Sequence, residues 1–117
     1  MQFLEELESL GVNTKEGLDR VLGDESLYEM MLGLFVTSVE GSPIGMEEFD
    51  GADRTSLMEK LHALKGTAGN LSLTPLFTHY TTALDMLRNN DPAGARKEYE
   101  ALLPAQAEII SCIQRHQ

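Results

Sequence analysis

One histidine combines a reactive side chain with neighbours that could assist a reaction. In an α-helix, at about 100° per residue, the apolar residues around His62 form a stripe about 80° wide. That stripe consists of Leu57, Leu61, Leu64, Ala68 and Leu71. His62 falls on a different stripe, together with Lys65, Gly66 and Gly69. An imidazole at the rim or in solvent, one turn from a lysine, could act as a nucleophile beside a cation.

The residues around this histidine predict a surface that another molecule can approach. Gly66 and Gly69 each cost a helix roughly 1 kcal/mol relative to alanine, so we expect them to leave room for a partner at His62. Met58 lies one turn before His62. A methionine there is suited to an apolar docking patch, because its side chain is flexible and adapts to several partners.

The run from His62 to Leu71 resembles the motif of histidine-containing phosphotransfer (HPt) domains of bacterial phosphorelays. That motif reads His-x-Leu-Lys-Gly-x-Ala/Ser, followed by two mostly small residues and an aliphatic one. The matching residues are His62, Leu64, Lys65, Gly66 and Ala68, with Gly69-Asn70-Leu71 as a common continuation. The resemblance also covers the helical layout of nearly the whole chain. It departs at Ser72, where the family often has glycine, and the segment 73–77 reads as one residue longer than usual.

The resemblance implies a stoichiometric phosphohistidine carrier rather than an enzyme. His62 would accept a phosphoryl group from an aspartyl phosphate of a receiver domain and pass it to another receiver aspartate. Its reactive atom would be the ring nitrogen farther from the backbone, and Lys65 would stabilise the phosphoryl oxygens. With the longer connection, Leu84-Asp85 takes the place of the family's Leu-Glu pair, so Asp85 would lie near the His62 face.

The resemblance also implies the partners. These would be receiver domains of response regulators or of hybrid histidine kinases. No cofactor is expected in this chain, because magnesium would sit in the acidic pocket of the receiver. The sequence contains neither Gly-x-x-x-x-Gly-Lys-Ser/Thr nor Gly-x-Gly-x-x-Gly, so we do not expect it to phosphorylate itself from ATP.

Two other hypotheses remain open at this stage. The chain could be a phosphate-independent helical interaction domain that binds or sequesters a receiver or kinase, and Ser72 leaves room for this. A metal-binding bundle would need His62, His79 or Cys112 to converge with carboxylates. The helical faces give no support for that convergence, and Cys112 with His116 is a weak pair, so no metal site is predicted.

Length and charge narrow the class of protein further. The 117 residues predict a single domain spanning 1–117. The net charge of −10 is concentrated in residues 1–60, which hold 14 acidic and 4 basic side chains, against 5 of each in 61–117. Nucleic acid is a poor partner for such a surface. The chain has no basic leader and no apolar run of membrane-spanning length, so we expect no membrane association.

The sequence also favours one compartment and a monomeric state. One cysteine excludes an internal disulfide and suits a reducing cytoplasm. We expect a monomer, because no apolar stripe is left over once the core is assigned.

Every long segment has helical spacing, which predicts an all-α protein. Capping signals at Asn13, Asp24, Asp53, Thr74 and Asp91 mark helix starts. Pro104 predicts a kink or break in the last helix. Met30 and Leu34 are assigned to the apolar face of the helix that begins at Asp24. The pattern predicts an up-down-up-down four-helix bundle with one or two short N-terminal helices.

Overall fold

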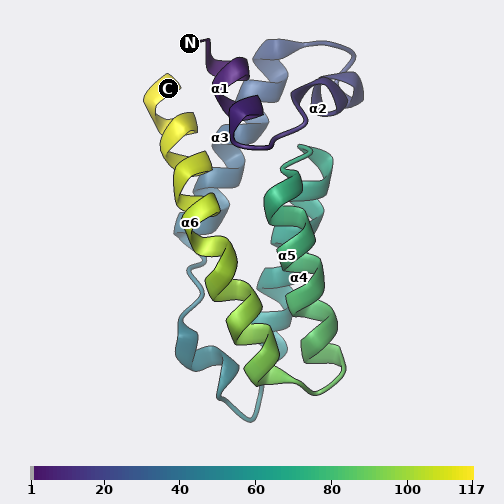
Figure 1. Ribbon diagram of the computed structural model, residues 1–117, viewed down its shortest axis with the longest axis vertical. Helices are drawn as coiled ribbons and strands as arrows, with labels where there is room; N and C mark the ends of the chain where they lie inside the picture. The colour runs from purple at the N-terminus through teal and green to yellow at the C-terminus, as the bar shows by residue number, and fades with distance from the viewer. Residues whose placement is uncertain (1) are drawn as a thin grey trace.

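The computed structural model describes residues 2–117, and every regular element in that range is a helix. In chain order the elements are α1 (Phe3–Ser9), α2 (Thr14–Arg20), α3 (Glu25–Gly41), the short 3-10 helix η1 (Met46–Phe49), α4 (Thr55–Asn70), α5 (Thr74–Arg88) and α6 (Pro92–His116). Helices α3, α4, α5 and α6 alternate in direction along the long axis (Figure 1). The prediction of an all-α four-helix bundle with one or two short N-terminal helices is therefore confirmed, and the structure has two of them, α1 and α2.

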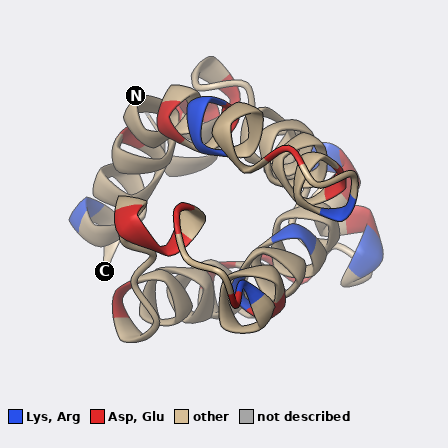
Figure 2. Cartoon of the chain, turned by 90° about the horizontal axis from the view of Figure 1, so that it is seen from below, with Lys and Arg blue, Asp and Glu red and all other residues tan. Residues whose placement is uncertain are grey.

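The four long helices close into a ring. Helix α4 packs between α3 and α5, and α6 contacts both α5 and α3. Seen along the bundle, the helices surround a common axis, and positions of acidic and basic residues occur all around the ring (Figure 2). Helix α1 packs against α6 at the end where both chain termini lie, and η1 contacts α6 toward the opposite end (Figure 1).

Side-chain caps start three of the helices as predicted. Asn13 accepts a hydrogen bond from the Glu16 amide at 3.1 Å, and Asp24 accepts one from the Leu27 amide at 3.0 Å. Asp91 caps α6 in the same way through the amide of Gly94. These carboxylate and amide oxygens satisfy backbone N–H groups that have no partner inside the helix.

The other two predicted caps are wrong in detail. Helix α4 has Arg54 at its cap position, and Asp53 accepts a hydrogen bond from the Thr55 amide at 3.0 Å instead. Thr74 is already the first helical residue of α5, which follows Leu73. In both cases the helix begins within one residue of the predicted position, because the start signal is local while the cap geometry depends on the preceding loop.

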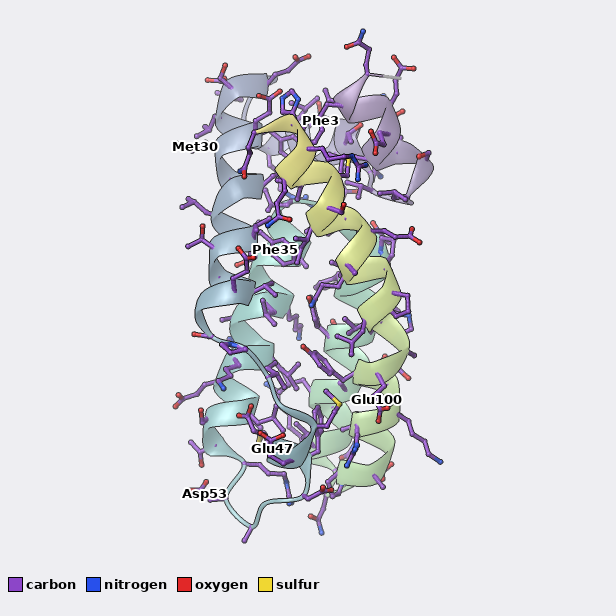
Figure 3. All side chains as sticks on the ribbon, turned by 90° about the vertical axis from the view of Figure 1, so that its left-hand side faces the viewer. Phe3, Met30, Phe35, Glu47, Asp53 and Glu100 are labelled. Atoms are coloured by element: carbon purple, nitrogen blue, oxygen red, sulfur yellow. The ribbon has the colours of Figure 1, made fainter. Side chains whose placement is uncertain are left out.

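The structure corrects two further expectations. Helix α6 runs through Pro104 without a break, and Pro104 is exposed, so a break at this residue is excluded while the predicted kink stays a prediction. Met30 and Leu34 are each 58% exposed, although the sequence pattern assigned them to the apolar face of α3. Figure 3 shows Met30 on the outer edge of α3 and Phe35 turned toward the interior. The core of α3 is instead formed by Tyr28, Leu32, Phe35 and Val36.

A monomer is predicted because the sequence pattern leaves no apolar stripe outside the core. The exposure of Met30 and Leu34 removes that argument, and the monomeric state stays a prediction. Over residues 2–117, no helix combines the length and the apolar character needed to cross a membrane.

Candidate functional site

His62 lies on the outer side of helix α4 because the leucines of this helix face the core. Leu57, Leu61, Leu64 and Ala68 are buried, each at most 6% exposed. His62 itself is exposed. The 3.6-residue repeat of the leucines therefore determines that the imidazole faces solvent, as predicted.

His62 lies at a shallow depression of about 370 Å³ between α4 and α5. The lining residues are Thr55, Met58, Glu59, His62 and Ala63 from α4, with Leu84 and Arg88 from α5. Met58 is thus brought to His62 as the sequence predicted. Leu84 and Arg88 were missed. Their spacing of four residues places them on one face of α5, but the sequence does not reveal which face of α5 meets His62.

Lys65 and Gly66 follow His62 on the same helix. Lys65 is half-buried, and within residues 2–117 its side chain forms no hydrogen bond or ion pair. Gly66 is exposed, and a β-carbon added there would meet no atom within 4 Å. The surface beside His62 is therefore open at Gly66, and the neighbouring ammonium group is available to an incoming anion.

Gly69 has a different environment from Gly66. A β-carbon added at Gly69 would lie 3.2 Å from the ring of Phe77 on α5. Gly69 therefore allows α4 and the Phe77 side chain to approach closely, a packing role that the sequence analysis did not anticipate. Its role in docking a partner stays a prediction.

Asp85 is not among the residues that line the depression. It is exposed on α5, and its carboxylate oxygen lies 3.5 Å from a guanidinium nitrogen of Arg88. Arg88 rather than Asp85 borders the depression. On the α5 side, the depression is therefore lined by an apolar residue and a cation. The carboxylate of Asp85 lies outside the depression, beside Arg88.

The turn after α4 explains how a serine can occupy position 72, where the motif that this chain resembles often has glycine. Ser72 is buried and adopts φ 57°, a left-handed conformation that glycine takes most readily. Its hydroxyl donates to Glu16 at 2.7 Å and accepts a hydrogen bond from Arg20. Arg20 also donates to the Asn70 carbonyl at 3.1 Å. These bonds tie α2 to the α4–α5 turn and offset the unfavourable backbone of Ser72.

The same network changes the acidity of Glu16. The hydrogen bond from Ser72, and next the one from Arg20, lower the pKa of the Glu16 carboxyl below its ordinary value. The turn is also held from the core side, where the Tyr28 hydroxyl donates to the Leu71 carbonyl at 2.7 Å. Burial raises the pKa of Tyr28 to about 12.

The remaining histidines and the cysteine serve other contacts. His79 Nδ1 lies 2.6 Å from a carboxylate oxygen of Glu98, between α5 and α6. His116 stacks on Phe3 with ring centroids 4.0 Å apart, and Cys112 is buried. Throughout 2–117, no cluster of three or more His, Cys, Asp or Glu side chains is arranged to hold a metal ion.

Comparisons with known proteins do not assign the chain to a family. No protein-family model, no curated protein and no solved structure matches it.

Proposed function

We propose that this chain is a phosphohistidine carrier of the HPt type, which relays phosphoryl groups between receiver domains. The observation that carries the proposal is the placement of His62. The imidazole stands exposed on a helix whose other side is anchored in the core, with Lys65 one turn away and Arg88 across the same depression.

Phosphoryl transfer requires mainly positioning and the stabilisation of charge, so a rigid scaffold with few reactive groups is sufficient. In the forward step, Nε2 of a neutral His62 attacks the phosphorus of an aspartyl phosphate. The N–P bond forms while the O–P bond breaks, and the receiver aspartate leaves as a carboxylate. Lys65 and Arg88 are placed to attract the phosphoryl oxygens and the acidic pocket of the receiver.

The open surface at Gly66 supports the same proposal, because a receiver must bring a recessed aspartate close to His62. The Ser72 turn supports it as well, since the serine there adopts the backbone conformation that the family's glycine would favour. A carrier of this kind would act in the cytoplasm, where its phosphodonors reside, and the single buried cysteine suits a reducing compartment.

The test is phosphate transfer from a receiver domain that has been charged with a small-molecule phosphodonor. Wild-type chain and His62→Gln are compared side by side. We expect an acid-labile, alkali-stable phosphate on the wild type alone, with unchanged helical content in the variant because His62 is not part of the core. Absence of label on the wild type, despite measurable receiver binding, would favour a phosphate-independent domain that sequesters its partner.

A further inference from the structure

At the end of the bundle where the chain termini lie, a histidine of α6 joins three helices. The ring of His116 stacks on that of Phe3 from α1, with ring centroids 4.0 Å apart and planes 2° from parallel. Figure 3 shows Phe3 beside the end of α6. The Nε2 atom of His116 lies 3.1 Å from a carboxylate oxygen of Glu29 on α3. The imidazole therefore contacts an aromatic face and a carboxylate that belong to two different helices.

Helix α1 depends on its contacts with α6 for its position. It has seven residues, no side-chain cap at its start, and Leu7 as the one side chain in Phe3–Ser9 that is fully buried. Besides the stack on His116, Glu6 of α1 pairs with Arg115 on the last turn of α6. Short elements that bury little surface open locally at a low cost in free energy. The contacts of Phe3 and Glu6 are therefore important for keeping α1 on α6.

Helix α1 covers the thiol of Cys112. This cysteine lies one turn before His116 and is 1% exposed. It lines a small cavity of about 190 Å³ together with Phe3 and Glu6 of α1 and with Arg115 and His116 of α6. A thiol needs access to its reagent in order to react, so a buried cysteine is labelled only when its cover moves aside. The reactivity of Cys112 therefore reports whether α1 is closed or open.

We infer that protonation of His116 closes α1 over Cys112, which makes this end of the bundle a pH-sensitive clasp. A protonated imidazole is a cation on the face of the Phe3 ring and an ion-pair partner of the Glu29 carboxylate, and a neutral one is neither. Imidazole groups take up their proton between about pH 8 and pH 5. The clasp is tight at the acidic end of this range and loosens as the pH rises through it.

The other ionisable groups near the ring do not reverse this direction. Arg115 on α6 is a cation, but its guanidinium is paired with Glu6 from α1. Cys112 on α6 stays uncharged in this pH range, because burial raises the pKa of its thiol. Glu29 on α3 is the anion that pairs with the ring itself. In the range 2–117, these groups are the ionisable ones that line the cavity or pair with His116.

The test measures how fast a thiol reagent labels Cys112 in the full chain between about pH 5.5 and pH 8. Each rate is divided by the rate for the same chain unfolded in urea at the same pH, so that the intrinsic pH dependence of the thiol cancels. We expect the normalised rate to rise by about three- to tenfold from the acidic to the alkaline end. This is the combined scale of one exposed ion pair and one cation–π contact.

Two variants attribute the rise to the clasp. His116→Gln should be labelled at every pH at about the normalised rate that the wild type reaches at the alkaline end. Glu29→Gln should show a smaller rise, because the stack on Phe3 remains. His79→Gln is the matched control, since it removes another imidazole that lies beside a carboxylate, that of Glu98, but between α5 and α6. We expect it to keep the full rise.

Three outcomes would overturn the inference. The first is a normalised rate that does not change with pH in the wild type, and the second is an unchanged rise in His116→Gln. The third is labelling that depends on urea as steeply as global unfolding does, because Cys112 would then be exposed by unfolding of the whole bundle rather than by opening of α1. Phosphate takes no part in these measurements, so their result is independent of the function proposed above.

Discussion

The polar side chains at the α4–α5 turn are bonded to one another, whereas those on the exposed side of α4 are not. At the turn, Arg20, Glu16 and Ser72 form a connected network that reaches the Asn70 carbonyl. Around His62, the side chains of Glu59 and Lys65 have no hydrogen bond or ion pair with any residue of the range 2–117. The two regions are adjacent along the same helix.

This contrast separates groups that hold the fold from groups that can serve a partner. A buried hydroxyl must be hydrogen-bonded, because leaving it unsatisfied costs about 1–3 kcal/mol. A charged side chain that reaches solvent has no such requirement, and the fold gains little from pairing it. Substitutions in the turn should therefore change stability, and substitutions beside His62 should change transfer.

The largest effect expected beside His62, apart from loss of His62 itself, comes from Lys65→Ala. Losing one stabilising cation should raise the barrier to phosphoryl transfer by about 1–3 kcal/mol, a slowing of roughly 5- to 150-fold. The rate of single-turnover phosphoryl transfer from a phosphorylated receiver, compared between Lys65→Ala and the wild type, measures this slowing. The free energy of unfolding should stay within about 0.5 kcal/mol of wild type, as for an ordinary surface change. An unchanged transfer rate would remove the role assigned to Lys65.

In the turn, Ser72→Ala should lower the free energy of unfolding by about 1–2 kcal/mol, because both hydroxyl contacts are lost while φ stays positive. Ser72→Gly loses the same contacts but relieves a backbone cost of about 1 kcal/mol, so it should be less destabilising. Urea unfolding of the wild type, Ser72→Ala and Ser72→Gly measures the free energy of unfolding of each protein and so ranks their stabilities. If Ser72→Ala has the same free energy of unfolding as the wild type, the hydrogen bonds of the Ser72 hydroxyl contribute nothing to the stability of the fold.

The two glycines of α4 should respond differently to alanine. Gly66→Ala should stabilise the chain by up to about 1 kcal/mol, because the added methyl group meets open space in a helix interior. Gly69→Ala should gain less, since the methyl group would press on the Phe77 ring. The unfolding temperatures of Gly66→Ala, Gly69→Ala and the wild type measure this difference in stability. Gly66→Ala should also slow transfer from a receiver, and a stabilised variant with unchanged transfer would exclude Gly66 from the docking surface.

The smallest effect expected is a dependence of stability on acidity. The pKa of Glu16 is lowered by its bonds to Ser72 and Arg20, and that of Glu48 by the Gly45 amide at 2.7 Å and by Lys60. A carboxyl with a lowered pKa in the folded state stabilises the fold above its ordinary pKa of 4.5. That contribution is lost as the pH falls through the folded-state value.

The unfolding temperature should therefore decline as the pH drops below about 4.5, and Glu48→Gln should make the decline shallower. A scan of unfolding temperature against pH for both proteins measures this difference. Parallel curves for the two proteins would show that Glu48 contributes nothing to acid sensitivity.

The candidate site was predicted from the sequence to the extent that it lies on one helix. The spacing of Leu57, Leu61 and Leu64 determines which side of α4 is buried, and hence that His62 is exposed. The residues that α5 contributes could not be predicted in this way. The rotation of α5 about its own axis decides that Leu84 and Arg88, rather than Asp85, border the depression, and no local pattern encodes that rotation.

The sequence by itself determined the helical class, most helix starts and the outward position of His62, because these follow from the 3.6-residue repeat and from short-range capping. Only the tertiary structure decided that Arg88 borders His62, that Phe77 covers Gly69 and that Met30 and Leu34 remain exposed. It also revealed the left-handed backbone at Ser72 and the partners that make it tolerable. These features depend on how whole helices are rotated and displaced against one another, which is set by side chains distant in the sequence.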